Sequence, residues 1–147
     1  MIFWDSSAVI PLLVREKMTR RMQAQLERDR HMLVWWATRV ECASAISRLE
    51  REQSLSPEDV ISAFDRLAVI ADGWNEVSPT RSLRQMAQRL LRVHPLRAAD
   101  ALQLAAAVVA SEQRPPSLLF STLDGRLESA ARREGFAIVD PQPAKRG

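Results

Sequence analysis

The chain has 147 residues, with 21 lysines and arginines against 18 aspartates and glutamates, which gives a formal net charge of +3 and an isoelectric point of about 9.9. This length suits one domain with a sizeable core, and the basic balance permits a polyanionic partner. A single cysteine, Cys42, excludes an intrachain disulfide. No apolar run approaches the roughly 20 residues of a membrane helix. A signal peptide requires a basic region before its apolar stretch, and no such region precedes the first apolar stretch here. We therefore expect a cytoplasmic protein with no membrane partner, one domain over residues 1–140 and a polar tail over residues 141–147.

Hydrophobic periodicity and turn residues predict strands that alternate with helices. In chain order, the expected elements are a strand at 2–5, helices at 8–13 and 17–28, a strand at 32–36, helices at 38–53 and 57–70, a short strand at 76–77, helices at 80–93 and 100–110, a strand at 118–122, a helix at 125–134 and a strand at 136–139. This alternation favours an α/β fold with a mostly parallel sheet covered on both faces. The 100–110 helix is apolar nearly all round, so we expect it to be the central buried helix.

Local signals add detail to the first half of the chain. Ser6–Ser7 should cap the first helix, and Thr38 should cap the helix that begins there. Helical spacing places Val40 on the inward face of that helix. Trp35 and Trp36 end the second strand, and we expect them in the core rather than exposed as a base-stacking platform.

Four acidic residues each interrupt or end an apolar segment. Asp5 closes the first strand and Asp124 follows the fourth, so both should lie at the carboxyl ends of buried strands, where open α/β sheets place their sites. Glu41 and Asp100 lie in helices that otherwise face a core. A lone buried carboxylate is costly unless it is paired, protonated or bound to metal. We interpret the four acids as one divalent-metal site.

Each acid also has an ordinary structural explanation, which the sequence leaves open. Asp5 can cap the following helix, and Asp124 can form a turn. Glu41 can pair with a nearby arginine, and Asp100 can pair with Arg97. All four structural explanations would have to hold together to make the interpretation as a metal site unnecessary.

The residue types favour magnesium or manganese over other chemistries. These ions take hard oxygen ligands, and they serve phosphodiester hydrolysis by activating water and neutralising charge. His31 and His94 are the only histidines, which argues against a zinc site, and His94 is expected to lie in a loop. With four glycines the chain has no glycine-rich phosphate loop.

Further polar residues lie beside the four acids or on the expected helices. Ser6 and Thr122 are placed to hydrogen-bond the carboxylates. Arg81, Arg84 and Arg97 are candidates for contacts with a nucleic-acid backbone, although arginines on such helices usually form a solvated face.

At these residues the chain resembles the PIN-domain ribonucleases, and among them the VapC-type toxins of bacterial toxin-antitoxin modules. The matching segments are Phe3–Val9, Thr38–Glu41, Ala99–Ala105, Thr122–Leu127 and the stretch from Ala130 to Val139. Each segment alone is a weak signal, but the four acidic positions in order at this length are fairly specific.

The resemblance implies a three-layer αβα sandwich, RNA cleavage that depends on Mg²⁺ or Mn²⁺, a homodimer, and a small VapB-like antitoxin that blocks the site. Asp5, Glu41, Asp100 and Asp124 match the acidic positions of the family. The chain departs from some relatives because Ala98 and Ala99 offer no additional acid before Asp100. This departure favours one ion over two.

The resulting hypothesis is an endoribonuclease. Asp5 and Asp100 ligate the metal, Asp124 binds it directly or through water, and Glu41 positions or deprotonates the attacking water. Two alternatives stay open: a PIN-like dimeric module that binds a partner without turnover, and a structure-specific DNA nuclease with the same chemistry. The RNA, its cleavage position, the antitoxin and the preferred ion are beyond the sequence.

Overall fold

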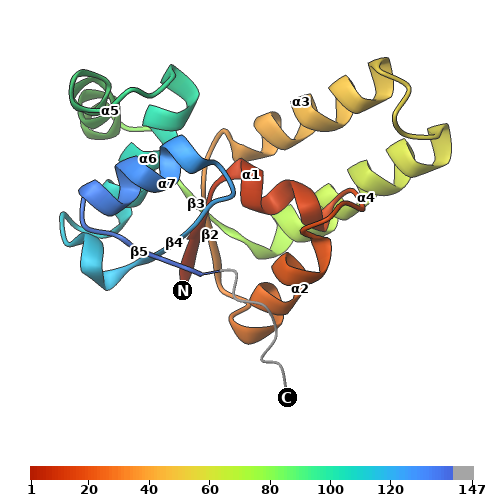
Figure 1. Cartoon of the computed structure of the whole chain (residues 1–147), viewed down its shortest axis with the longest axis horizontal. Helices are drawn as coiled ribbons and strands as arrows, with labels where there is room; N and C mark the ends of the chain where they lie inside the picture. The colour runs from red at the N-terminus through yellow and green to blue at the C-terminus, as the bar shows by residue number, and fades with distance from the viewer. Residues whose placement is uncertain (141–147) are drawn as a thin grey trace.

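The computed structural model describes residues 1–140, and the predicted polar tail over residues 141–147 lies outside this range. Five strands form one sheet in the order β3-β2-β1-β4-β5, and every neighbouring pair is parallel (Figure 1). The strands are β1 (Ile2–Trp4), β2 (Met32–Trp35), β3 (Asn75–Val77), β4 (Leu119–Ser121) and β5 (Ala137–Ile138). The α-helices of this range are α1 (Ser6–Val9), α2 (Thr19–Arg28), α3 (Thr38–Arg51), α4 (Pro57–Gly73), α5 (Arg81–Val93), α6 (Ala98–Ala110) and α7 (Gly125–Arg133), and the short 3-10 helices are η1 (Ile10–Leu12) and η2 (Pro115–Ser117). The predicted α/β fold with a parallel sheet is confirmed.

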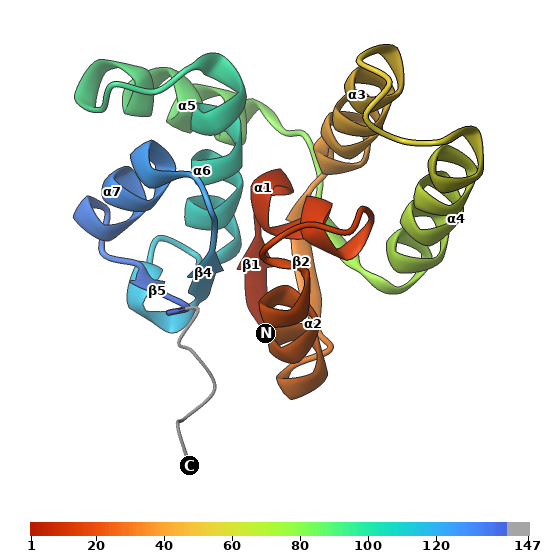
Figure 2. The same cartoon turned by 45° about the vertical axis from the view of Figure 1, so that its right-hand side comes forward.

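Alternate side chains of each strand enter two separate cores. In β1, Phe3 packs with α5, α6 and α7, whereas Ile2 and Trp4 pack with α1, α2, α3 and α4. The same alternation in β2 sends Trp35 to the first core and Val34 to the second. Figures 1 and 2 show these two groups of helices on opposite sides of the sheet. The sheet is therefore the middle layer of three, because successive strand residues point to opposite faces.

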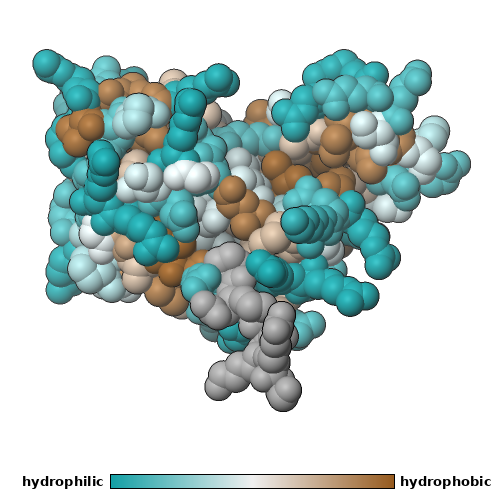
Figure 3. All heavy atoms as spheres, viewed as in Figure 1, coloured by the Kyte–Doolittle hydropathy of each residue, from teal (hydrophilic) through white to brown (hydrophobic). Residues whose placement is uncertain are grey.

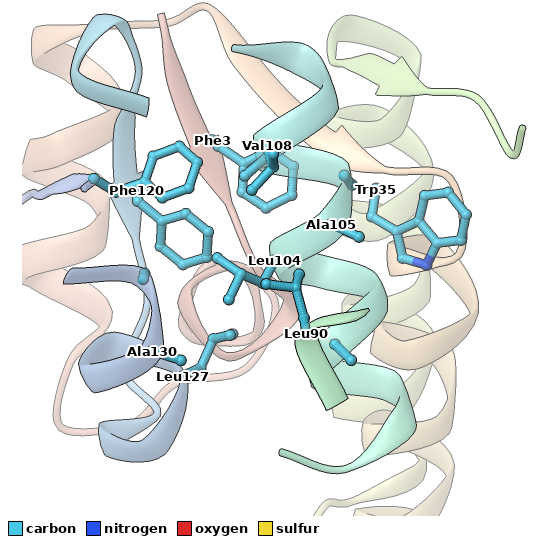
Figure 4. Packing of buried hydrophobic residues seen from close by; sticks show 14 of the residues in the cluster. Phe3, Trp35, Leu90, Leu104, Ala105, Val108, Phe120, Leu127 and Ala130 are labelled. Carbon is cyan, nitrogen blue, oxygen red and sulfur yellow. The ribbon is translucent and has the colours of Figure 1, made fainter. Parts of the chain in front are cut away.

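Helix α6 lies at the centre of the first core, as predicted. Leu104 lies among Leu90 of α5, Leu127 of α7 and the strand residues Phe3 and Phe120 (Figure 4). The two phenylalanine rings stack with centroids 5.3 Å apart. This packing fixes the position of α6 against β1 and β4, and with it the position of the acid in the first turn of α6.

Two predictions of helix caps were wrong. Asp5, not Ser6–Ser7, is the N-cap of α1, and its side chain accepts a hydrogen bond from the Ala8 N–H. Ala37 is the N-cap of α3, and Thr38 is the first helical residue. Thr38 is fully buried, and its hydroxyl accepts a hydrogen bond from α6 instead of from its own helix. Tertiary contacts therefore replace the local capping interaction that the sequence suggested.

Two predictions of burial near the end of β2 were also wrong. Trp35 is buried in the core as expected, but Trp36 is 53% exposed and Val40 is 68% exposed. The strand ends at Trp35, and the chain turns before α3, so Trp36 no longer follows the inward-outward alternation of the strand. Cys42, Ala45 and Ile46 form the buried face of α3 in place of Val40.

One face of the described range carries both hydrophilic and hydrophobic side chains (Figure 3). On the face shown in Figure 3, hydrophobic side chains gather where α1, α3 and α4 meet, and hydrophilic side chains cover most of the rest. No helix within residues 1–140 combines the length and the apolar character needed to span a membrane.

The order of the strands creates a switch point between β1 and β4. From β1 the chain builds β2 and β3 on one side, and it then crosses to build β4 and β5 on the other. The Asp5 N–H donates to the Ser121 carbonyl at 3.1 Å, which extends the pairing of the two strands to their carboxyl ends. Open α/β sheets bind ligands at such a point.

Candidate active site

The four acids predicted from the sequence lie at the amino ends of four different helices. Asp5 caps α1 and Asp124 caps α7, while Glu41 and Asp100 lie in the first turns of α3 and α6. Helix amino termini favour negative charge because the aligned backbone dipoles place a partial positive charge there. The fold thus places four carboxylates where backbone dipoles partly offset their charge.

Electrostatic repulsion links the four acids into one group. The charge of Asp124 raises the pKa of Asp5 and of Asp100, and the charge of Asp100 raises the pKa of Glu41. Within residues 1–140 none of the four carboxylates forms an ion pair with a basic side chain. The structure therefore brings together the residues that the sequence grouped, and it leaves their charge uncompensated by a salt bridge in this range.

Asp5 is the most deeply buried of the acids, at 2% exposure. Burial raises the pKa of Asp5 to about 7, against the opposing effect of hydrogen bonds from Ser7, the Ala8 N–H and Thr122. The Ser7 hydroxyl donates to Asp5 Oδ1 at 2.7 Å, and the Ala8 N–H donates to the same oxygen at 3.2 Å. The capping role considered for Asp5 is correct, but a cap does not require such deep burial.

Glu41 is held by two neutral donors. The Ser6 hydroxyl donates to Glu41 Oε2 at 2.7 Å, and Gln103 Nε2 lies 3.3 Å from each carboxylate oxygen. Burial raises the pKa of Glu41, these hydrogen bonds lower it, and repulsion from Asp100 raises it further. The alternative that Glu41 pairs with an arginine is wrong for the described part of the chain.

Asp100 and Asp124 have different surroundings. Burial raises the pKa of Asp100, the charge of Asp124 raises it further, and the charges of Arg97 and Arg126 lower it. Arg97 thus acts on Asp100 electrostatically, and within residues 1–140 it does not form the ion pair that the alternative required. Asp124 Oδ1 accepts hydrogen bonds from the N–H groups of Arg126 and Leu127, at 2.9 and 3.1 Å, so Asp124 is a helix cap as well as a member of the site.

Two polar residues that the sequence analysis did not assign to the site hydrogen-bond the acids. Ser7 bonds Asp5, lies 3.2 Å from the Thr122 hydroxyl, and accepts from the Leu123 N–H at 2.9 Å. Gln103 Nε2 donates to the Thr38 hydroxyl at 3.0 Å as well as to Glu41. The sequence contained a signal for Gln103, because Gln103 follows Asp100 by three residues on a predicted helix and therefore lies on the same face of that helix.

The other predicted residues have mixed outcomes. Ser6 does bond a carboxylate of the site, but the carboxylate belongs to Glu41. Thr122 accepts from the Asp124 N–H at 3.0 Å and belongs to the network around Asp5. Arg81 and Arg84 lie on the first turns of α5 and line a separate cavity of about 350 Å³. Their role in nucleic-acid binding stays a prediction.

The donor atoms fit a hard divalent cation that keeps much of its water. All four side chains offer carboxylate oxygens, and the serine, threonine and glutamine around them supply only oxygen and amide groups. In residues 1–140 no three acidic, histidine or cysteine side chains converge into a complete metal-binding group. Mg²⁺ takes only one or two carboxylates directly and retains several waters, so not all four acids need to bind such an ion directly.

Comparisons with known proteins identify the family and the fold. A sequence model described as the PIN domain matches residues 2–133. The chain is 25% identical over 142 residues to Ribonuclease VapC45 of Mycobacterium tuberculosis, covering 97% of this chain and 96% of that protein. Its fold is similar to the FitAcB structure from Neisseria gonorrhoeae, with a TM-score of 0.65, 18% identity and coverage of 96% of this chain and 98% of that one. It is also similar to a toxin-antitoxin complex from Klebsiella pneumoniae, with a TM-score of 0.66, 15% identity and coverage of 98% and 100%.

Proposed function

The chain belongs to the PIN-domain family, and on that premise we propose that it is a metal-dependent endoribonuclease and the toxin of a toxin-antitoxin pair. The observation that carries the proposal is the group of four acids at the sheet's switch point, which repel one another and have no ion pair within residues 1–140. A purely structural set of buried acids would gain stability from basic partners. Uncompensated carboxylates instead leave room for a cation.

Two of the acids would hold the ion directly. Asp5 and Asp100 are the proposed ligands, and Asp124 would bind the ion directly or through a water. When bound, Mg²⁺ or Mn²⁺ supplies neutralisation of phosphodiester charge and lowers the pKa of water. The proposal has one ion, since the Ala98–Ala99 pair provides no further acid beside Asp100.

Glu41 is the proposed group that orients the attacking water or takes its proton. Burial raises the pKa of Glu41, which makes its carboxylate a stronger base than that of an exposed glutamate. Ser6 and Gln103 fix both carboxylate oxygens from opposite helices, which keeps the side chain in one orientation. Arg81, Arg84 and Arg97 are proposed to contact the RNA backbone.

The proposed biological partner is a small antitoxin that covers the site. Support comes from the solved neighbours, which include a toxin-antitoxin complex, and from the relatives named VapC ribonucleases. A homodimer is proposed from the family alone.

The test is cleavage of single-stranded RNA and single-stranded DNA by the wild type and by Asp5→Asn, with Mg²⁺, Mn²⁺ or chelator. Asparagine keeps an oxygen that can accept from the Ala8 N–H, so the cap survives while the charge is lost. We expect metal-dependent loss of RNA with the wild type alone. If Asp5→Asn cleaved RNA as fast as the wild type, the proposed site would be overturned. If only the DNA were cleaved, the proposed substrate would be DNA instead of RNA.

A further inference from the structure

Helix α7 lines a cavity of about 240 Å³ that the site described above does not use. His94 and Pro95, between α5 and α6, form one wall, and Arg126, Ser129 and Arg133 of α7 form the other. Resting on the proposed function, we propose that this α7 cavity binds a backbone phosphate of single-stranded RNA next to the phosphate that is cleaved. Nothing in the comparisons with known proteins assigns a ligand to it.

The polar residues of the cavity share one face of α7. Arg126, Ser129 and Arg133 follow one another at intervals of three and four residues, and residues at this spacing lie on one side of a helix. The stripe spans two turns, about 10 Å along the helix axis. Two guanidinium groups and a hydroxyl therefore border the same cavity, and all three can donate hydrogen bonds to phosphate oxygens.

The two arginines of the cavity have no acidic partner within residues 1–140, unlike their neighbour on the same helix. Arg132 Nη2 lies 3.5 Å from Glu128 Oε1, one turn away. In the described part of the chain, no ion pair involves Arg126 or Arg133. The basic charge on the cavity side of α7 is therefore available to an anion.

Glu134, which follows Arg133 directly, pairs with other residues. Glu134 Oε2 lies 2.7 Å from His94 Nε2, and Glu134 Oε1 accepts from Arg89 Nη2 at 3.1 Å. Both oxygens of Glu134 are thus occupied by groups of α5 and the loop after it. The same contacts hold His94 in the cavity wall, where it is buried at 5% exposure although it lies in a loop as predicted.

The cavity opens beside the acids. Gly125, which also lines it, follows Asp124 directly, so the cavity borders the residue next to one of the four acids. The N–H groups of Arg126 and Leu127 are already taken by Asp124, so the side chains, not the helix end, would hold the anion. An RNA strand whose scissile phosphate lies at the acids would pass over this end of α7.

The physical need for such a site follows from the charge of the acids. Four carboxylates repel a phosphodiester, and one divalent ion offsets only part of their charge. Arginines beside the acids would attract the flanking backbone, and Arg suits phosphate because its planar donors match two oxygens. The volume lies below that of pockets for drug-sized ligands, which fits a phosphate and its sugar rather than a whole nucleotide with its base.

The test is the affinity of a short fluorescent single-stranded RNA of mixed sequence, measured by anisotropy in chelator over a range of salt. The variants are Arg126→Gln, Arg133→Gln and the two combined, and the control for each single substitution is Arg132→Gln, which removes one positive charge from the same helix. We expect the double variant to bind about tenfold more weakly, and its log affinity to depend less on log salt by about 0.7 for each phosphate that it no longer neutralises. Arg132→Gln should stay near the wild type in both.

Equal affinities of the double variant and Arg132→Gln would overturn the phosphate site. A DNA strand of the same sequence should show the same loss of affinity, because the cavity would bind phosphate, and a loss confined to RNA would overturn the phosphate assignment in favour of ribose. RNA cleavage in Mg²⁺, measured on the same samples, separates the two proposals. If the wild type cleaves RNA and the double variant binds RNA normally, only the proposal of a phosphate site in the α7 cavity is overturned. If the wild type binds RNA through the cavity but does not cleave it, only the proposal of nuclease activity is overturned.

Discussion

Gln103 Nε2 lies 3.3 Å from both carboxylate oxygens of Glu41 and donates to the Thr38 hydroxyl at 3.0 Å. Gln103 is 1% exposed, and its Oε1 has no hydrogen-bond partner in residues 1–140. A buried amide with an unsatisfied oxygen costs stability. The arrangement ties the acid of α3 to the helix that carries Asp100, and it identifies Gln103 as a positioning residue for Glu41.

Replacing Gln103 with methionine should reduce RNA cleavage by about 10- to 100-fold, the usual cost of losing a group that orients a catalytic carboxylate. KM should change little, since Gln103 is buried behind Glu41. The loss of the amide donors also removes a contribution that lowers the pKa of Glu41. The corresponding limb of the pH-rate profile should therefore move to higher pH.

The stability of Gln103→Met provides the control for this prediction. Methionine has a similar volume and removes the unsatisfied oxygen, but it leaves the buried Thr38 hydroxyl without its donor, so the stability should fall by about 1–3 kcal/mol. Such a fall in stability with an unchanged pH profile would mean that Gln103 serves only packing.

Asp100→Asn should abolish cleavage and leave the fold intact. The substitution removes repulsion with Asp124 and Glu41, so in chelator the variant should melt no lower than the wild type. Asp65→Asn makes the same chemical change on the exposed surface of α4 and should leave both properties unchanged. A marked loss of stability in Asp100→Asn would instead assign Asp100 to a structural role.

The metal-free protein should lose stability as pH rises from about 4 to about 7, because burial raises the pKa of Asp5 from 3.8 to about 7. In this window the folded state binds the Asp5 proton and the unfolded state releases it, so ∂ΔG/∂pH of unfolding is negative. The contribution of the protonated Asp5 to the free energy of unfolding is fully present below the pKa of Asp5 in the unfolded state. It is lost as the pH rises through the pKa of Asp5 in the folded state. Its size is a few kcal/mol, at about 1.4 kcal/mol per pKa unit.

Urea unfolding of the wild type and Asp5→Asn in chelator, at several pH values across this window, measures the effect. Asparagine does not titrate, so the stability of the variant relative to the wild type should increase with pH. A difference that stays constant with pH would contradict the raised pKa. Added Mg²⁺ should stabilise the wild type more at the upper end of the window, since a metal ligand must be deprotonated.

Ser7→Ala should destabilise the protein by about 1–3 kcal/mol, because it removes the hydroxyl that bonds the buried Asp5 and the Leu123 N–H. It should also weaken stabilisation by Mg²⁺, since Ser7 orients Asp5. Ser82→Ala, at an exposed position in the first turn of α5, is the matched control for thermal melting with and without the ion. Identical melting of the two variants would contradict the role of Ser7.

Local patterns in the chain were enough to place most of the fold. The strands of the first core, the apolar α6 and the Ser56 cap before Pro57 appear where periodicity and turn residues predicted them. Boundaries shifted by a few residues, as at α4, which extends to Gly73. Errors of exposure occurred at Trp36 and Val40, where the chain leaves β2, because periodicity does not indicate where a strand stops.

The sequence by itself determined the α/β class and the parallel sheet, which depend on short-range periodicity, and it drew attention to the four acids, because each lies in or beside an apolar segment. Only the tertiary structure decided which donor holds which carboxylate. Ser6 bonds Glu41 across 35 residues, and Gln103 reaches Glu41 across 62. Ser7 joins Asp5 to the β4–α7 loop. Such contacts arise because α3 and α6 pack on opposite faces of one sheet. No local pattern along the chain indicates that these residues, far apart in the sequence, come into contact.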